Sequence, residues 1–405
     1  MKRSLAHVHR ALVYGALLAA YHLACPVTIA QQHDEAWVIS QITAGKFEEL
    51  ASLEKLSGRG VPFAMYWWGI ILERCIFERC DKDAARELIL RAAIAGHGRA
   101  QTQVFAAAAS RQEFDELVAK IGVPPGGWER FAYICKALLL IDSAPVFGGK
   151  PRPDDGKLRT QLLTMAKSEP RIAMRTSAAV LQGPTSGDLE ALAETGIDAI
   201  SEQLMQRALV TKISDRQIIE RARAGQLGWA AAYCDSLMIR TGRTVLDRDE
   251  LDVCEKAAAA GFPAAVRGLL THHQFAGSTR AAQYFADLCE KILGARCAGP
   301  ISEYYSARSK ESAEFRAKWE FWDLVAANML SATNLFPGGV GEEELRGKTP
   351  ELRRRLFQLV VRTDLIAETC GMQRLDPATG AVEANPRCPW RRPIAIPAEF
   401  LSGAK

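Results

Sequence analysis

One pattern of small and apolar positions recurs along this chain. Small residues come first, a glycine follows, a small or apolar residue comes about four positions later, and an apolar helical run begins there. The pattern is centred on Gly96, Gly196, Gly225 and Gly261. Gly196 and Gly225 are 29 residues apart, and Gly225 and Gly261 are 36 residues apart. Intervals of this length are typical of helical-hairpin repeats.

The repeat predicts how the chain folds. Each unit is two antiparallel helices, the glycine ends the second helix, and the alanines allow the helix backbones to approach closely. A single hairpin cannot bury its apolar stripe alone, so neighbouring hairpins stack and the core runs along the array. We therefore expect an all-α fold, an α-solenoid of antiparallel helical hairpins over residues 31–298 with a mostly helical C-terminal region over 299–369.

The segments between and after the repeats also have helical or loop character. Proline and glycine mark their ends, as in the break at 122–127. In chain order we expect a helical cap over 31–56, a helix over 128–141, a loop over 143–156, an aromatic-rich helix over 303–334 and a last helix over 342–369.

The tail, residues 370–405, is rich in Cys, Pro and Arg. Residues 376–380 read Asp-Pro-Ala-Thr-Gly, which is a turn sequence. Cys370 and Cys388 lie nine residues either side of Thr379 within that turn. We expect a small β-hairpin over 372–383, closed by this pair of cysteines.

Two units carry a resemblance to a known repeat. The clearest unit reads Ala64, Gly69, Leu72, Asp83, Ala84, Leu88, Ala92, Ala93, Gly96, Ala100, and the next reads Ala257, Ala258, Gly261, Ala265, Leu269, Gly277, Ala281, Ala282, Phe285. They resemble the Sel-one-like repeat, a relative of the tetratricopeptide repeat, over 60–105, 220–293 and more faintly 157–220. The usual Gly-x-Gly loop is replaced in the first unit and shortened in the second. The resemblance implies a scaffold that mediates protein–protein interaction in the bacterial cell envelope, in assembly, export or regulation.

The first thirty residues have the layout of a secretory signal peptide. Residues 1–10 are basic, 11–24 are largely apolar, and Thr28-Ile29-Ala30 offers small residues for cleavage before Gln31. We expect cleavage near Ala30. An uncleaved anchor is the second interpretation, and lipidation at Cys25, which follows Leu23-Ala24, is the third. The membrane is a partner only in the last two cases, and the protein is periplasmic or secreted in the first.

Nine cysteines follow Cys25, and export to an oxidising compartment makes disulfides the expected state. Cys234 and Cys254 each lie ten residues from Thr244, the middle of a loop, so the two sulfurs face each other if helices flank that loop. Some exported bacterial members of the family that the repeat resembles carry disulfides between the two helices of a unit, and the symmetric placement of Cys234 and Cys254 resembles that arrangement. Cys289 and Cys297 bracket a glycine that is expected to end a helix.

Cys75 and Cys80 are a less obvious pair. Five residues on a continuous helix place two side chains about 140° apart. These cysteines can therefore pair only if the helix ends between them, near Glu78. Cys135 is left over, and we expect a buried thiol rather than a nucleophile.

Composition and charge narrow the classes of function. The chain has 51 basic residues; without Lys2, Arg3 and Arg10 it has 48, against 47 acidic residues. That balance gives no nucleic-acid-binding footprint, which requires a clustered basic excess. A zinc site is not expected, because paired Cys-x-x-Cys units are absent and the adjacent His272 and His273 cannot share a helical face. We expect these two histidines at a loop-facing helix end, and no metal or cofactor.

The candidate catalytic motifs of this chain can also be interpreted as solvent-exposed helix faces. Glu311-Ser312 resembles the start of the catalytic motif of soluble lytic transglycosylases, but the rest of that motif is absent. We expect no catalytic residue, and treat an envelope glycan hydrolase or lyase, acting on peptidoglycan or exopolysaccharide, as the alternative. That alternative requires an acid pair that converges in a cleft. Arg353-Arg354-Arg355 spans three helix faces, which favours a solvated surface over an anion-binding patch.

Aromatic side chains are the candidate contacts with a partner. Tyr66, Trp67 and Trp68 are adjacent and cannot all point inward from one helix, so at least one is expected at the surface. Trp319 and Trp322 are spaced for a helix core, with sugar stacking as the alternative. The sequence therefore predicts a non-catalytic periplasmic or secreted scaffold whose partner is another exported protein or a cell-envelope polymer.

Overall fold

The fold is described from a computed structural model of the full chain. The structure describes residues 34–77, 79–143, 152–168, 171–241, 245–331, 349–374, 376, 382–383 and 385–401. The predicted signal peptide, Cys25, the segment 332–348 and most of the predicted turn 376–380 lie outside the described residues.

The described residues form helices joined by short turns, so the predicted all-α fold is confirmed. The N-terminal half contains α2 (Glu35–Thr43), η1 (Phe47–Ser52), α3 (Leu53–Gly58), α4 (Pro62–Glu73), α5 (Lys82–Ile94), α6 (Gly98–Ala107), α7 (Arg111–Ile121), α8 (Gly127–Ser143), α9 (Asp155–Ser168), α10 (Ile172–Gln182), α11 (Asp188–Leu192) and η2 (Ala193–Thr195). The C-terminal half contains α12 (Asp198–Val210), α13 (Asp215–Arg223), α14 (Leu227–Thr241), α15 (Arg248–Ala259), α16 (Pro263–Phe275), α17 (Thr279–Leu293), η3 (Gly294–Cys297), α18 (Ala298–Arg308), α19 (Ala313–Ser331), α21 (Pro350–Gly371) and η4 (Ala398–Phe400).

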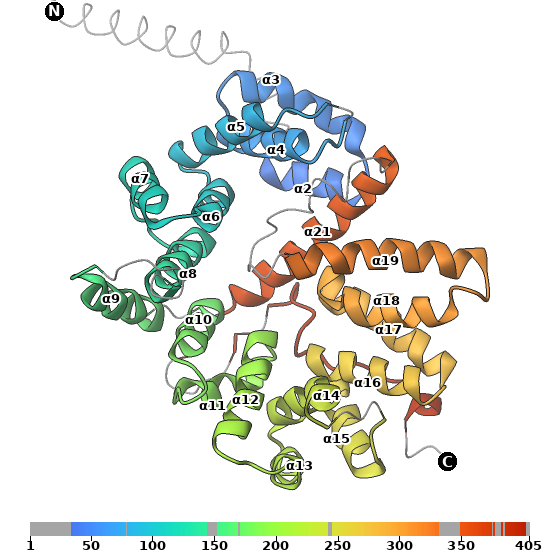
Figure 1. The fold of residues 1–405 in the computed structure, drawn as a ribbon. Coiled ribbons are helices and arrows are strands. Elements are labelled where there is room, and N and C mark those ends of the chain that lie inside the picture. Colours follow the sequence, from blue (N-terminus) through green and yellow to red (C-terminus); the bar gives the residue numbers. More distant parts are fainter. Residues whose placement is uncertain are drawn as a thin grey trace, which may run out of the picture.

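Successive helices are arranged along a curved array (Figure 1). Consecutive helices pack antiparallel, and every second helix also packs on the next but one, from α6 through α8, α10, α12 and α14 to α16. This two-layer stacking is the arrangement expected of an α-solenoid. Helix α21 departs from it, because it runs inside the arc rather than extending it.

The glycines of the repeat end helices as predicted. Gly96, Gly196, Gly225 and Gly261 all have positive φ angles, a backbone region that glycine adopts without steric cost. Close helix packing depends on another glycine, Gly268 in α16, where an added Cβ would lie 2.5 Å from the carbonyl oxygen of Cys234 in α14.

Three apolar cores follow the array. The N-terminal core runs from Val38 to Ala100, the middle core from Phe105 to Ala178, and the C-terminal core from Ile172 onward through α19. None of the described helices combines the length and the apolar character needed to cross a membrane.

The aromatic-rich segment forms two helices instead of the single helix predicted over 303–334. Helix α18 ends at Arg308 and α19 begins at Ala313, and the two fold back on each other. The break has a local cause, since the Ser312 hydroxyl accepts a hydrogen bond from the backbone N–H of Phe315 at 3.1 Å and so caps α19. The expectation of one continuous helix was wrong.

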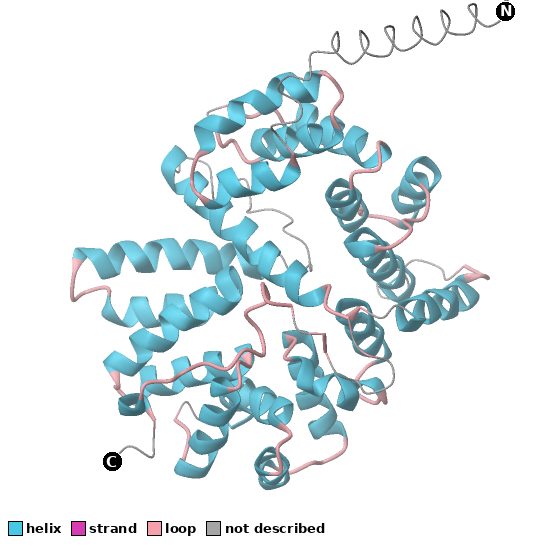
Figure 2. Ribbon diagram, turned by 180° about the vertical axis from the view of Figure 1, so that it is seen from behind, coloured by secondary structure: helices cyan, strands magenta, loops and turns pink. Residues whose placement is uncertain are grey.

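The tail crosses the last units as a long loop (Figure 2). Among the described residues no strand forms, and the predicted β-hairpin over 372–383 is reduced to isolated contacts. The backbone N–H of Glu383 donates to the carbonyl oxygen of Arg374 at 2.9 Å, and Arg374 forms its bridge with Arg171 of the α10 region. The described tail thus pairs both with itself, at Arg374 and Glu383, and with the array, at Arg171.

All four predicted disulfides are present, joining Cys75 to Cys80, Cys234 to Cys254, Cys289 to Cys297, and Cys370 to Cys388. Helix α4 ends at Glu73, before the point near Glu78 that the sequence suggested, which frees Cys75 to turn toward Cys80. Cys135 is a free thiol, and burial raises its pKa to about 11. Four disulfides are typical of a protein from an oxidising compartment.

The Cys234–Cys254 disulfide joins α14 to α15 across the loop that the sequence places between them. Replacing both cysteines by alanine should lower the free energy of unfolding by about 3 kcal/mol, because the cross-link closes a loop of 20 residues in the unfolded chain. Chemical denaturation measures the change, with Cys135→Ala, which removes no disulfide, as the control. Peptide mapping that finds Cys234 and Cys254 as free thiols in the oxidised protein would contradict the pairing.

Candidate functional site

Helix α21 joins the two ends of the array. Leu356 and Leu359 belong to the C-terminal core, whereas Phe357 and Val361 belong to the N-terminal core. The ring centroid of Phe357 lies 6.4 Å from that of Trp67, with the two rings edge to face. A helix that is apolar on two faces is stable only where both faces are covered.

Polar contacts fasten the first half of α21 to the N-terminal units. Arg353 donates to the carbonyl oxygen of Cys75 at 3.1 Å. Arg354 pairs with Glu48 at 3.0 Å, and the Gln358 amide donates to the carbonyl oxygen of Thr43 at 2.7 Å. The solvated face predicted for Arg353-Arg354-Arg355 was therefore wrong for the first two arginines, because α21 lies within the arc. Arg355 is exposed and lies 4.5 Å from the ring centroid of Phe321.

The opposite face of α21 contacts η3. The backbone N–H of Ala295 donates to the Thr363 hydroxyl at 2.8 Å, and this hydroxyl donates to the carbonyl oxygen of Leu359. Gly294 has a φ of 58°, and an added Cβ would lie 2.4 Å from the Thr363 oxygen. Only glycine fits this contact.

Charged groups gather where the second half of α21 meets both ends of the array. We call this cluster the charged junction and define it by the residues that interact electrostatically there: Glu35, Tyr66, Arg74, His97, Arg99, Arg296, Asp364 and Glu368. They come from α2, the α4 region, α6, η3 and α21. The junction therefore draws on segments more than 300 residues apart in the chain.

Arg99 is the centre of the charged junction. Its Nε lies 3.1 Å from a carboxylate oxygen of Glu35, and its terminal nitrogen pairs with Glu368 of α21. The Trp67 indole N–H donates to the same Glu35 oxygen at 3.1 Å. One guanidinium thus links α2 to α21, a geometry that arginine provides and lysine does not.

His97 holds the other oxygen of the Glu35 carboxylate. Its Nε2 lies 3.3 Å from that oxygen, while its Nδ1 accepts the backbone N–H of Ala100 and caps α6. Burial alone would raise the pKa of Glu35, but His97, Arg99 and Trp67 together hold it below its usual value.

Asp364 has the opposite electrostatic character. Asp364 is half-buried, and desolvation raises its pKa to about 7 although Arg99, Arg296 and Arg74 all favour the charged form. The neighbouring Glu368 raises this pKa further. Burial also raises the pKa of Tyr66. The junction thus combines an ionised carboxylate, Glu35, with a carboxyl that changes its charge near neutral pH.

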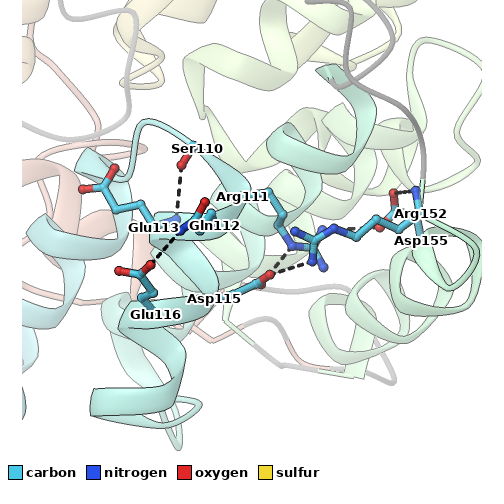
Figure 3. A network of polar contacts seen from close by, with 8 residues as sticks. All are labelled: Ser110, Arg111, Gln112, Glu113, Asp115, Glu116, Arg152 and Asp155. Carbon is cyan, nitrogen blue, oxygen red and sulfur yellow. Dashed lines mark hydrogen bonds and ion pairs between the residues drawn. The ribbon is translucent and has the colours of Figure 1, made fainter.

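A second polar network holds α7 against the start of α9 (Figure 3). Asp115 accepts hydrogen bonds from Arg111 at 3.0 Å and from Arg152 at 2.6 Å, and Arg111 also reaches Asp155 at 3.4 Å. Burial opposes the charge of Asp115, but Arg152 and Arg111 together lower its pKa below the usual value. Ser110 caps α7 by accepting the backbone N–H of Glu113. This network positions two helices and presents no group that is free to react.

The predicted partner contacts lie largely inside the molecule. Tyr66, Trp67 and Trp68 are all buried, so the expectation that at least one lies at the surface was wrong. Trp67 is covered by α21, and the ring centroids of Tyr66 and His97 lie 4.9 Å apart. The three rings are therefore buried against several different elements and not against a single neighbouring helix.

The C-terminal aromatics and histidines also belong mainly to the core. Trp322 is buried, as its spacing predicted, and Trp319 is half-buried. His272 accepts the backbone N–H of Leu246 at 3.0 Å, so it faces a loop from the last turn of α16 as expected, although both histidines are buried. Burial lowers the pKa of His273 to about 4.

Glu311 lies in the turn before α19 and is exposed, with its carboxylate 2.8 Å from Arg308. Among the described residues, no group of three or more His, Cys, Asp or Glu side chains has the geometry of a metal site. The charged junction is the one group of functional candidates here that the sequence did not reveal. The sequence does contain a pattern that could have indicated it. Two apolar residues and then two acidic residues lie on one stripe of a helix, at Phe357, Val361, Asp364 and Glu368.

No family model, no curated protein and no solved structure matches this chain.

Phe357 tests whether α21 closes the array. Phe357→Ala should lower the free energy of unfolding by about 3 kcal/mol, because it removes a buried ring that touches Phe47 and Trp67. Phe275→Ala, at a half-exposed position on α16, is the matched control and should change stability by no more than about 0.5 kcal/mol. Equal small effects in chemical denaturation would show that α21 does not stabilise the fold.

The raised pKa of Asp364 predicts how the free energy of unfolding changes with pH. Its folded-state pKa of about 7 lies above the ordinary value of 3.8, so its neutral form favours folding below about pH 4. That contribution is lost as pH rises through about 7. Asp364→Asn should therefore be increasingly more stable than the wild type between pH 4.5 and 8, by a few kcal/mol at most, at about 1.4 kcal/mol per pKa unit.

The comparison uses the difference in unfolding free energy between variant and wild type at each pH. His273 titrates with the opposite sign, since its lowered pKa costs stability as pH falls from 6.5 toward about 4, but it is present in both proteins and cancels. Asp83→Asn, at an exposed position on α5, is the matched control and should give a flat difference. A flat difference for Asp364→Asn as well would contradict the raised pKa.

Proposed function

We propose that this chain is a non-catalytic scaffold of the bacterial cell envelope, exported to the periplasm or secreted, with its signal peptide cleaved near Ala30. It would hold another exported protein or an envelope polymer during assembly, export or regulation. The proposal includes membership of the Sel-one-like repeat family, which is supported by the glycine-ended helices at Gly96, Gly196, Gly225 and Gly261.

The observation that carries the proposal is the closure of the array by α21. One helix contributes to the cores at both ends, the charged junction links α2, α6 and η3 to it, and four disulfides add covalent links. A frame of this kind loses little conformational entropy when a partner binds. That is the physical requirement for a scaffold.

The partner surface differs from the one that the sequence suggested. With Tyr66, Trp67, Trp68 and Trp322 buried, these aromatic side chains are not available as contacts with a partner. Large exposed apolar side chains occur instead at helix ends, on Ile94 of α5 and on Leu209 and Val210 of α12.

Affinity capture tests the proposal. The full chain, tagged at its C-terminus and purified in its exported form, is incubated with an envelope extract, and the retained material is identified by mass spectrometry. We expect a specific, stoichiometric protein or polymer to be retained by the wild type and to be reduced with Phe357→Ala, which loosens the frame. Retention no greater than that of an unrelated tagged exported protein would reject the scaffold.

An envelope glycan hydrolase or lyase is the second candidate, and one observation favours it. The charged junction contains a carboxyl with a raised pKa, Asp364, and a carboxylate with a lowered pKa, Glu35. Environments that drive two pKa values apart are a feature of acid–base catalysis. Glu35 pairs with Arg99, which in turn pairs with Glu368 of α21, so this carboxylate serves the packing of α21, which is the reason for preferring the scaffold.

Release of soluble fragments from purified peptidoglycan separates the two candidates. A scaffold releases none. An enzyme releases fragments at a rate that falls at least about a hundredfold in Asp364→Asn and Glu35→Gln, while Glu54→Gln, at an exposed position, keeps the full rate.

A further inference from the structure

The C-terminal tail is held at the end of α15 by three hydrogen bonds to consecutive carbonyl oxygens. The backbone N–H of Ile394 donates to Ala259 at 2.7 Å, the Arg391 guanidinium donates to Ala260 at 3.1 Å, and the backbone N–H of Arg391 donates to Gly261 at 2.9 Å. The last carbonyls of a helix lack partners within the helix and carry partial negative charge. An extended segment with an arginine is therefore a suitable ligand for them.

Glycine is required at this contact for a second reason besides its backbone angle. An added Cβ on Gly261 would lie 2.2 Å from the carbonyl oxygen of Arg392. The guanidinium of Arg391 also lies 4.0 Å from the ring centroid of Phe262, the residue after the glycine. We call this arrangement, Ala259 to Phe262 at the end of α15, the tail seat.

The end of α5 repeats the tail seat in sequence and in backbone geometry. Residues 256–262 read Lys-Ala-Ala-Ala-Ala-Gly-Phe, and residues 91–97 read Arg-Ala-Ala-Ile-Ala-Gly-His. Three backbone hydrogen bonds close each end in the same way. At the end of α5 the N–H groups of Ala95, Gly96 and His97 donate to the carbonyl oxygens of Arg91, Ala93 and Ala92. At the end of α15 the N–H groups of Ala260, Gly261 and Phe262 donate to the carbonyl oxygens of Lys256, Ala258 and Ala257. Gly96 has a φ of 87° and Gly261 one of 84°.

The two ends differ in what covers them. Gly261 is buried beneath the tail, whereas Ile94, Ala95 and Gly96 are exposed. Nothing in the described part of the chain lies within 4 Å of a Cβ added to Gly96. The side chain of Ile94 is 52% exposed, and it occupies the position that Ala259 has in the tail seat. This end therefore offers an extra apolar contact as well as the same carbonyls.

The end of α13 shows that the glycine turn alone is not sufficient. The carbonyl oxygen of Gly225 already accepts the backbone N–H of Leu227 at 3.0 Å. Arg223 stands where Ile94 stands in α5, and a cation there would repel an incoming arginine. Of the three ends, that of α5 alone combines the three closing hydrogen bonds and an uncovered glycine with an exposed apolar residue two positions before it. His97 stands there in place of Phe262, and the Glu194 carbonyl that also accepts from Arg391 in the tail seat comes from another unit.

We propose that the end of α5, residues 91–97, is a second copy of the tail seat and binds an extended, arginine-bearing segment of a partner protein. The expected segment has the pattern Arg-x-Pro-apolar, as in residues 391–394, with backbone N–H groups on the arginine and on the apolar residue. The carbonyls of residues 94–96 accept these donors, and Ile94 packs on the apolar side chain. This inference rests on the proposed scaffold function and names the chemistry of its partner.

A peptide with the sequence of residues 389–396, Pro-Trp-Arg-Arg-Pro-Ile-Ala-Ile, tests the site on the full chain. We expect saturable binding in fluorescence anisotropy, weakened about tenfold when glutamine replaces the first arginine. With a photoreactive benzophenone in place of the tryptophan, cross-links should fall on residues 91–98. Cross-links confined to 256–262 would mean that the peptide only displaces the tail, and would overturn the proposal, as would a lack of saturable binding.

Two pairs of variants locate the interaction. Gly96→Ala adds a Cβ at the position that corresponds to Gly261 of the tail seat and should weaken binding about tenfold. Gly225→Ala introduces the same strain at a positive φ angle and should leave binding within about twofold. Ile94→Lys should also weaken binding about tenfold, whereas Leu209→Lys should leave it unchanged. Both positions are exposed, so both variants should fold. Equal effects within either pair would reject the site. Failure of the peptide with success of the capture would reject this site and leave the scaffold intact.

Discussion

The burial of α21 on two faces is the constraint on which the rest of this structure depends. A curved array of hairpins has two open ends, and each end exposes an apolar surface that a neighbouring repeat would otherwise cover. Here Phe357 and Val361 cover one end while Leu356 and Leu359 join the other, so a single helix serves as the cap for both. The array is thereby closed by its own C-terminal region, and the side chains that line the arc, Trp67 among them, are enclosed rather than presented to a ligand.

Closure brings charges as well as apolar side chains into the interior. Arg99 satisfies Glu35 and Glu368, so these three groups are paired when they lose water. Asp364 interacts electrostatically with Arg99, Arg296 and Arg74, yet burial outweighs all three cations and raises its pKa. The positive and negative charges of the junction therefore balance when Asp364 is ionised, but the free-energy cost of desolvating its carboxylate favours the neutral form. Docking of α21 depends on both terms, and its strength changes with pH for that reason.

Local sequence features predicted much of the fold and little of the candidate site. Cys234 and Cys254 could be paired because their spacing about one loop is a property of a single hairpin, and Gly96 and Gly261 could be placed at helix ends because glycine tolerates positive φ. The break before α19 does not follow from the apolar pattern of 303–334, because it depends on the cap that the Ser312 hydroxyl forms. The burial of Trp67 could not be predicted from its neighbours. Its indole N–H reaches Glu35 and its ring meets Phe357, 290 residues along the chain, and no spacing rule reports such a contact.

The tail shows what a closed array leaves available for recognition. The inner side is occupied by α21, and the apolar stripes are buried between neighbouring helices, so the backbone groups that each unit leaves without helical partners include the carbonyls at its helix ends. The chain itself uses them, since Arg391 donates to Glu194 and Ala260 at the ends of two different units. A repeat that evolved to stop helices at glycine thus produces, as a direct consequence, a series of equivalent acceptor sites along its edge. Whether one of these sites binds a segment depends on its neighbouring side chains, as the contrast between Ile94 and Arg223 makes clear. Specificity in this architecture therefore resides in single residues beside a repeated backbone feature.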